Sequence, residues 1–269
     1  MPPSDPEPTT PWAQAAPAPC GAAPARDTLV AAIRSLAAYI SLSLYILLAG
    51  SIGLLLALLF RWKSILYILG HGGVALGARL AGIRYRVAGW ENVPRDRPVV
   101  FCANHQSNVE PPLLFRVLHP RLHVLYKAEL KKLPVLRRAF DLGGFIPVDR
   151  GNSEQAMAAI DRAAESLRAG NSFLTFPEGT RSRTGALLPF KKGGFIMAIK
   201  AEAPIVPVAV QGGTAAMRKG SAIIRPVMVS IRIGAPIETA GLGLSDRDEL
   251  IARTRATIEG LLAEGEISR

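Results

Sequence analysis

The chain has 269 residues, 49% of them hydrophobic, which accommodates one substantial globular domain with an appendage. Lys and Arg number 32 against 21 acidic residues, and the formal net charge of +11 indicates anionic partners such as nucleic acid, an anionic membrane or phosphorylated compounds. Aromatic residues make up only 6%, which disfavours nucleic acid, and two cysteines cannot form a disulfide framework.

The first segment, residues 1–26, is rich in Pro and Ala and lacks apolar periodicity. Such a segment cannot bury enough apolar surface to offset the entropy of the chain. We therefore predict a disordered tail, and its composition does not fit a signal peptide.

The next segment is apolar, and residues 35–60 contain no charged side chain. A helix of this length spans roughly 39 Å at ~1.5 Å per residue, which exceeds the ~30 Å hydrocarbon core of a bilayer. We predict a retained membrane anchor, because the segment is far longer than the apolar part of a signal peptide. Residues 64–80 are also mostly apolar but contain several glycines, which favours an interfacial helix. The sequence leaves open whether the anchor crosses the bilayer or bends back within one leaflet.

Basic residues are denser after the anchor than before it: Arg61, Lys63, Arg79, Arg84 and Arg86 follow, against Arg26 and Arg34. This bias predicts that the C-terminal part of the chain lies on the cytoplasmic face of the membrane. We accordingly divide the chain into the tail, a membrane-associated helical region at 27–84 and a globular domain at 85–269.

The globular domain alternates short apolar runs with helix-like stretches, which is typical of an α/β fold. Five runs with β-branched or aromatic content are candidate strands: 98–102, 122–126, 172–176, 205–210 and 227–233. Asn152 is expected to cap a helix that Gly170 ends, and a last helix is expected from Ser245. We predict a single mixed sheet flanked by helices and preceded by the N-terminal membrane-anchoring helical segment.

A first polar motif, residues 104–111, follows the first candidate strand. His105 and Glu110 are five positions apart, about 140° around a helix at roughly 100° per residue, so a regular helix would separate them. Pro111 and Pro112 favour a helix that begins near Glu110, which leaves His105 in a loop where the carboxylate can fold back onto the imidazole. Such a carboxylate fixes the imidazole tautomer, and the other ring nitrogen can then act as a base toward a substrate hydroxyl. The spacing alone equally allows a histidine that caps a loop.

A second motif, residues 176–183, follows the third candidate strand and reads FPEGTRSR. It combines the acid Glu178 with Gly179, which lets the backbone approach a ligand closely. Thr180 and Arg181 follow, and the planar guanidinium of arginine suits bidentate phosphate binding. A loop of this kind is typical of phosphate or polyol sites. A base together with an anion site suggests group transfer onto a phosphorylated alcohol.

These two motifs, with residues 144–150 and 204–208, resemble in order the four sequence blocks of the glycerolipid acyltransferase family, which includes 1-acylglycerol-3-phosphate acyltransferases. The resemblance implies that His105 is the catalytic base and Glu110 its acidic partner, although the usual block has Asp at the second position. It further implies contacts to the glycerol phosphate of the substrate from Lys127, Arg150, Glu178, Gly179, Thr180 and Arg181.

The same resemblance implies that residues 85–269 form a catalytic domain for phospholipid biosynthesis. The expected reaction moves a fatty acyl group from acyl-coenzyme A or acyl-carrier protein, without a cofactor, to the sn-2 hydroxyl of 1-acylglycerol 3-phosphate, forming phosphatidic acid. The expected partners are therefore the lysophospholipid, the acyl donor and membrane lipids. Two alternatives stay open: another lysophospholipid or a lyso-aminolipid as acceptor, or a non-catalytic membrane-tethered lipid-binding module.

Three further features give weaker signals. His119 and His123 have the spacing of a metal-binding pair, but a proline lies between them and no clustered acids or cysteines complete a site, so we expect no metal. Cys102 could carry an acyl group as a thiol, although a small apolar strand residue is favoured. Lys191 and Lys192 fit either a phosphate contact or a solvated turn.

Overall fold

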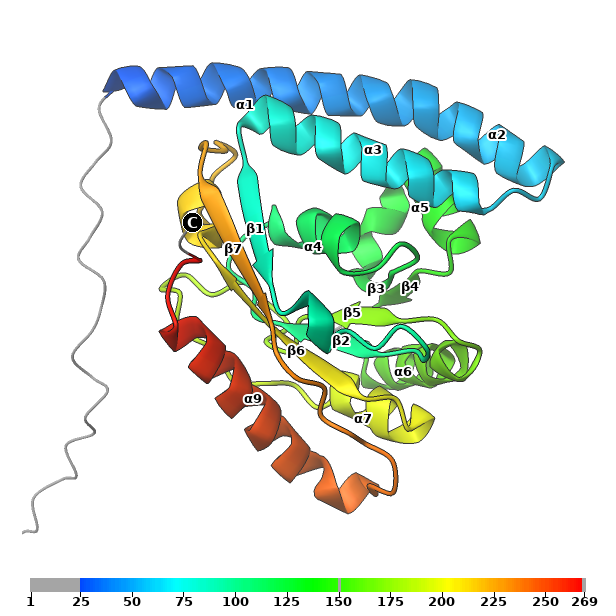
Figure 1. Ribbon diagram of the computed structural model, residues 1–269. Coiled ribbons are helices and arrows are strands. Elements are labelled where there is room, and N and C mark those ends of the chain that lie inside the picture. Colours follow the sequence, from blue (N-terminus) through cyan, green and yellow to red (C-terminus); the bar gives the residue numbers. More distant parts are fainter. Residues whose placement is uncertain (1–24, 150, 268–269) are drawn as a thin grey trace, which may run out of the picture.

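The N-terminal helices lie along one side of the domain in the computed structural model, which describes residues 25–149 and 151–267. The predicted tail at 1–26 falls almost entirely outside these ranges. Helix α1 (Ala25–Tyr45) continues through a π-helical turn (Ile46–Gly50) into α2 (Ser51–Leu59), and α3 (Ser64–Ala81) runs back beside them (Figure 1). Both apolar segments are thus helical, as predicted.

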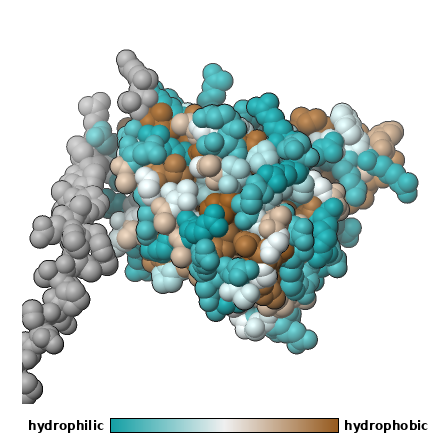
Figure 2. Space-filling view, turned by 60° about the horizontal axis from the view of Figure 1, so that its bottom comes forward, coloured by the Kyte–Doolittle hydropathy of each residue, from teal (hydrophilic) through white to brown (hydrophobic). Residues whose placement is uncertain are grey.

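α1 and α2 expose many large apolar side chains, whereas most of those of α3 are half-buried and only Ile68 is exposed. By length and composition, residues 27–59 and 64–81 could each cross a membrane, and only 11% of the most apolar stretch of either is buried. Viewed from below in the orientation of Figure 1, the surface is by contrast mainly hydrophilic, with hydrophobic side chains in smaller patches (Figure 2). The exposed apolar surface therefore belongs chiefly to the helical layer.

Within the described residues, seven strands form one sheet in the order β1-β7-β6-β2-β5-β3-β4. Their bounds are β1 Arg84–Ala88, β2 Val100–Ala103, β3 His123–Lys127, β4 Ile146–Val148, β5 Phe173–Thr175, β6 Ile205–Gln211 and β7 Met228–Ile233. β6 and β7 pair antiparallel and the other neighbours pair parallel, so the predicted mixed sheet is confirmed. β1 and β4 were not among the candidate strands.

Helices cover both faces of the sheet. Along β2, Val100 and Cys102 contribute to a core with the helices on one face, while Phe101 and Ala103 contribute to a second core on the other face. The first face carries α6 (Ser153–Arg168), α7 (Gly193–Ala201) and α9 (Arg247–Ala263); the second carries α4 (Glu110–Leu118), with α3 packed outside it. Shorter elements are α5 (Pro134–Leu142), α8 (Gly213–Ala216) and the 3-10 turns Trp90–Asn92, Ala128–Lys132 and Leu244–Asp246.

The two helices expected in the globular domain form nearly as predicted. The Asn152 side chain accepts a 3.0 Å hydrogen bond from the Gln155 N–H and caps α6, and the chain leaves the helix with Gly170 at φ 94°. α9 begins two residues after the expected Ser245 and buries Leu250, among others, against the sheet.

The sheet topology also places the polar motifs. β2 lies between β5 and β6, and all three strands are parallel, so their carboxyl ends meet at one edge of the sheet. The segments that follow these strands, residues 104–110, 176–183 and 212–219, therefore leave the sheet side by side. Ligands of α/β proteins commonly bind at such an edge.

Candidate active site

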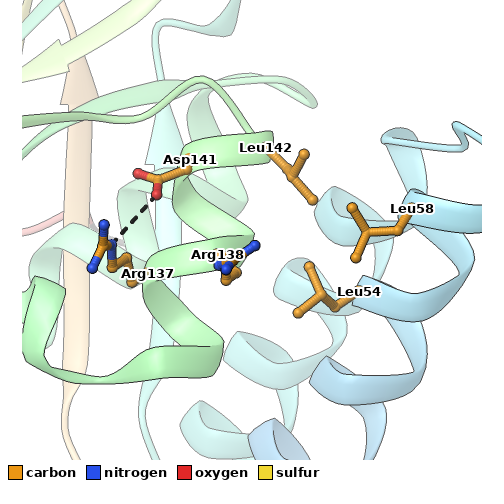
Figure 3. A pocket seen from close by; sticks show the side chains of 6 residues that line it. All are labelled: Leu54, Leu58, Arg137, Arg138, Asp141 and Leu142. Carbon is orange, nitrogen blue, oxygen red and sulfur yellow. Dashed lines mark ion pairs between the residues drawn. The ribbon is translucent and has the colours of Figure 1, made fainter.

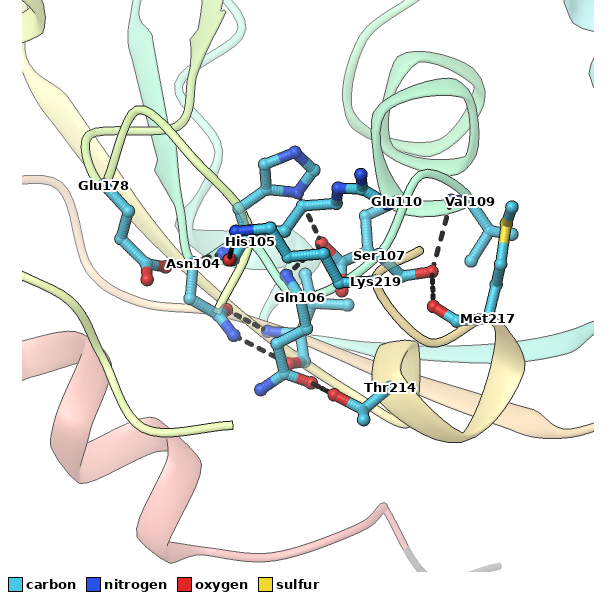
Figure 4. Close-up of polar contacts among 12 residues, drawn as sticks. Asn104, His105, Gln106, Ser107, Val109, Glu110, Glu178, Thr214, Met217 and Lys219 are labelled. Atoms are coloured by element: carbon cyan, nitrogen blue, oxygen red, sulfur yellow. Dashed lines mark hydrogen bonds and ion pairs between the residues drawn. The ribbon is translucent and has the colours of Figure 1, made fainter. Parts of the chain in front are cut away.

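A histidine and a glutamate form the centre of the site. The Nδ1 atom of His105 lies 2.8 Å from Oε2 of Glu110, the first residue of α4 (Figure 4). Glu110 is completely buried, and its Oε2 atom also accepts a 2.8 Å hydrogen bond from the Gln106 N–H. Because a carboxylate only accepts hydrogen bonds, Nδ1 carries the proton and Nε2 is the nitrogen that can take another. The fold of the carboxylate back onto the imidazole, predicted from the spacing, is confirmed.

The residue before the histidine fixes this loop to the sheet. The Asn104 side chain is buried, donates a 2.9 Å hydrogen bond to the Val210 carbonyl and accepts one of 2.7 Å from the Val210 N–H. The amide side chain thus continues the pairing of β2 with β6 for one more position. These two hydrogen bonds hold the backbone next to His105 in a fixed position on the sheet.

The second motif holds His105 from the other side. Glu178 is buried, and its two carboxylate oxygens accept hydrogen bonds from the His105 N–H, at 2.7 Å, and the Leu188 N–H, at 3.0 Å. Burial raises the pKa of Glu178, and these two hydrogen bonds oppose that rise. The His105 carbonyl accepts a 2.7 Å bond from the Ser182 N–H, and the Phe176 ring stacks on the imidazole at 4.3 Å.

This geometry differs from the substrate-binding role that the resemblance implied for Glu178. Both of its oxygens face backbone N–H groups, so its side chain joins the two motif loops and does not point to open space. The neighbouring Gly179 has φ 68°, and a Cβ there would press against the stem of Lys191. Lys191 therefore lies beside the second motif.

Among the cationic residues predicted to bind phosphate, Arg181 is connected most directly to the base. It immediately precedes Ser182, whose backbone N–H donates a hydrogen bond to the His105 carbonyl. Its side chain is half-buried. Lys127, at the carboxyl end of β3, is 61% exposed and forms a 2.8 Å ion pair with Glu129. Arg150 lies outside the described residues.

Residues after β6, which the sequence did not single out, complete the site. We call residues 212–225 the bracket segment. A Cβ at Gly213 would overlap Oε1 of Glu110, and the Met217 carbonyl accepts a 2.9 Å bond from the Ser107 hydroxyl. The Lys219 ammonium donates to Thr180 Oγ1 at 3.1 Å and to the Arg181 carbonyl at 2.8 Å. The bracket segment thus contacts both motifs (Figure 4).

The far end of the bracket segment is tied to α1. The Ser35 hydroxyl accepts a 2.8 Å bond from the Ile224 N–H and lies 3.2 Å from the Ile224 carbonyl. The Tyr39 hydroxyl donates a 2.9 Å bond to the Ala222 carbonyl. A polar connection therefore runs from the apolar N-terminal helix to the loops that hold the histidine.

An apolar cavity of about 710 Å³ adjoins these loops. Its walls come from α1, α3, α4 and α5, and next to the site they include Asn108, Val109 and Met217. Asn108 and Val109 belong to the loop between His105 and Glu110, so the cavity borders the loop that carries the base. This arrangement can place a long apolar ligand with its reacting end near His105.

Comparisons with known proteins agree with these observations. The acyltransferase family model matches residues 84–211, and a 1-acyl-sn-glycerol-3-phosphate acyltransferase from Limnanthes douglasii is 30% identical over 208 residues, which cover 75% of this chain and 73% of the relative. The chain belongs to the acyltransferase family. The resemblance of its sequence motifs to this family is thereby confirmed.

Two further relatives of this acyltransferase extend the comparison. The human 1-acyl-sn-glycerol-3-phosphate acyltransferase alpha is 32% identical over 177 residues, covering 65% of this chain and 62% of the relative. The crystal structure of the 1-acyl-sn-glycerophosphate (LPA) acyltransferase PlsC from Thermotoga maritima superimposes with a TM-score of 0.77 at 25% identity. That comparison covers 90% of this chain and 99% of the other, so the structural similarity includes the helical layer.

The acyltransferase structure also places Cys102, His119 and His123. Cys102 is buried in β2, and burial strongly raises the pKa of its thiol, which disfavours the thiolate that an acyl-carrying cysteine needs. His119 accepts a hydrogen bond from the Arg121 N–H, whereas His123 lies among Tyr67, Phe145 and other aromatic rings. No group of three or more metal-ligating side chains gathers among the described residues.

Proposed function

We propose that this protein transfers a fatty acyl group from an acyl thioester to the sn-2 hydroxyl of 1-acylglycerol 3-phosphate, forming phosphatidic acid for phospholipid biosynthesis. The single observation that carries the proposal is the 2.8 Å contact between His105 and the buried Glu110, in a loop that also lines the apolar cavity. The names of the Limnanthes douglasii, human and Thermotoga maritima relatives support the choice of acceptor.

In this mechanism Nε2 of His105 removes the proton of the acceptor hydroxyl while its oxygen attacks the thioester carbonyl. The new C–O bond forms, the C–S bond breaks, and the proton passes from the imidazolium to the departing thiolate. The Glu110 carboxylate stabilises the imidazolium and keeps the ring in its orientation. General-base assistance of this kind typically contributes ~10² to 10⁴ in rate.

The phosphate of the acceptor would be held by cationic side chains at the same edge of the sheet. Arg181 is the first candidate, because its backbone is fixed by Lys219 and by the Ser182 bond to His105. Arg150 and Lys127 are candidates by family resemblance. Lys127 would have to break its ion pair with Glu129 in order to bind the phosphate. The guanidinium fork of arginine matches phosphate geometry.

The proposed setting is the cytoplasmic face of the membrane. The helix of residues 27–59 runs along the side of the domain and exposes its apolar side chains, which supports insertion of α1, α2 and α3 into the nearer leaflet (Figure 1). The cavity beneath these helices could then receive an acyl chain directly from the bilayer. The basic bias after the anchor supports the cytoplasmic side, where acyl-coenzyme A or acyl-carrier protein can serve as the donor.

The experiment is acyl transfer by the purified full-length protein in detergent, with each donor in turn and a panel of lysolipids. We expect phosphatidic acid from lysophosphatidate and a loss of roughly 10² to 10⁴ in kcat for His105→Ala, with an unchanged unfolding midpoint. Preferential acylation of a phosphate-free acceptor would overturn the choice of substrate. A wild-type protein that binds lysophosphatidate but turns over no acceptor would indicate a binding module.

A further inference from the structure

A second cavity, of about 330 Å³, lies between α2 and α5 and is separate from the active-site cavity. In the view of Figure 3, Leu54 and Leu58 of α2 face Arg138 and Leu142 of α5 across it, and the Arg137–Asp141 pair lies farther from α2. The lining residues are Leu54, Leu58, Arg137, Arg138, Asp141 and Leu142.

The two cavities touch opposite sides of α5. Val135, Leu136, Ala139 and Phe140 line the active-site cavity, whereas the arginines line the second one. A ligand of the second cavity would therefore not occupy the site of the acceptor, although it would contact the same helix.

The second cavity is cationic. Arg137 pairs only loosely with Asp141, at 3.7 Å, and both side chains are about half exposed. Arg138 is exposed and makes no ion pair with any residue in the described ranges. With one acid against two guanidinium groups, the cavity has donors available for an anion.

The surroundings of the cavity combine apolar and basic side chains. In the turn before α5, Leu130 and Leu133 are 40% and 52% exposed, and Lys131 and Lys132 are exposed between them. The neighbouring end of α2 exposes further apolar residues, namely Leu55, Leu58, Leu59 and Phe60. Apolar side chains interleaved with Lys and Arg are typical of segments that lie at the boundary between acyl chains and headgroups.

We propose that this cavity binds an anionic phospholipid of the surrounding bilayer. The guanidinium groups of Arg138 and Arg137 hold the headgroup phosphate, and Leu54 and Leu58 contact the first methylenes of one acyl chain. The occupant is anionic because Arg138, unpaired among the described residues, and the loosely paired Arg137 face it. It is a bilayer lipid because the apolar wall is part of the helix that the membrane would surround. α5 thereby joins the N-terminal helices as a membrane-contacting element.

The test uses the full-length protein in neutral detergent, titrated with phosphatidylglycerol and, separately, with phosphatidylcholine. Bound lipids are counted by native mass spectrometry, and shifts of the unfolding midpoint give the affinity. We expect preferential phosphatidylglycerol binding, weakened about tenfold or more in the double variant Arg137→Gln and Arg138→Gln.

The matched control is the double variant Lys131→Gln and Lys132→Gln, which removes the same charge next to the cavity but not from it. This control should keep most of the affinity. Equal weakening of both variants would overturn the proposal in favour of general surface electrostatics, and so would equal binding of the two lipids. Displacement of phosphatidylglycerol by inorganic phosphate alone would also overturn it, because the apolar wall would then contribute nothing.

If the arginine variant fails to fold, Arg138→Lys provides the second test. Lysine keeps the charge but lacks the planar fork, so phosphatidylglycerol affinity should fall while the unfolding midpoint without lipid stays that of the wild type. Unchanged affinity in this folded variant would contradict a specific guanidinium contact.

Discussion

The backbone N–H of His105 donates a 2.7 Å hydrogen bond to the carboxylate of Glu178, a residue 73 positions further along the chain. The proposed base and the second motif are therefore parts of one rigid unit, which explains why an acid is found in a loop otherwise suited to anions. A buried carboxylate that accepts two backbone hydrogen bonds satisfies N–H groups that neither loop could satisfy alone.

The first prediction concerns this link. Glu178→Gln replaces one accepting oxygen with an NH₂ group that faces a backbone N–H, and a buried donor without an acceptor costs about 1–3 kcal/mol. We expect kcat to fall and the unfolding midpoint to drop, with KM for lysophosphatidate little changed. Steady-state kinetics and thermal unfolding measure these effects. A large rise in KM alone would instead show that Glu178 contacts the acceptor.

The second prediction addresses the length of Glu110. Glu110→Asp withdraws the carboxylate by about 1.5 Å, one C–C bond, while the start of α4 holds the backbone in place. The bond to His105 Nδ1 should then break, and kcat should fall by about tenfold or more. The unfolding midpoint should fall as well, because the buried Gln106 N–H loses its acceptor. Full activity in the variant would mean that the loop adapts to the shorter acid.

The third prediction follows from the close approach of Gly213 to Glu110. Gly213→Ala inserts a methyl group where no space exists, and we expect a loss of about 1–3 kcal/mol of stability together with a reduced kcat. Gly260→Ala is the matched control, because Gly260 lies in α9 with no heavy atom near its would-be Cβ. That substitution should stabilise the protein by about 0.5–1 kcal/mol and leave kcat alone. Equal effects of both variants on kcat would refute the steric argument.

The fourth prediction concerns pH. Burial, with a smaller contribution from His119, lowers the pKa of His123 to about 4 from its usual value near 6.5. As the pH falls from 6.5 toward 4, His123 becomes protonated in the unfolded chain but stays neutral in the native state. The free energy of unfolding should therefore decrease by on the order of 3 kcal/mol. His123→Phe keeps an aromatic ring and should flatten this part of the curve of unfolding midpoint against pH. Parallel curves for both proteins would contradict the shift.

Much of the fold could be predicted from the sequence because its central strands are buried on both faces and read as apolar runs. The two strands that were missed, β1 and β4, are the edges of the sheet. β1 carries Arg84 and Arg86 and is only half-buried, and β4 has three residues with Pro147 in the middle. Edge strands pair on one side only, so their sequences carry a weaker pattern.

The candidate site could be predicted in part for a related reason. His105 and Glu110 are close in sequence, and the position of Pro111 indicated the turn between them. Gly213 and Lys219 lie thirty or more residues from either motif, and an isolated glycine or lysine gives no signal of contact over such a sequence distance. The position of Glu178 could not be predicted, because an acid beside a glycine fits a ligand as well as a backbone N–H.

The bonds of Ser35 and Tyr39 to the bracket segment bear on how the protein can be handled. Removing residues 25–81 to obtain a water-soluble fragment would strip partners from the same chain segment that supports the catalytic loops. Such a fragment would also open one wall of the 710 Å³ cavity to solvent. The apolar N-terminal helices thus support the catalytic loops, and a crystal structure or an assay of the shortened protein would not represent the full-length enzyme.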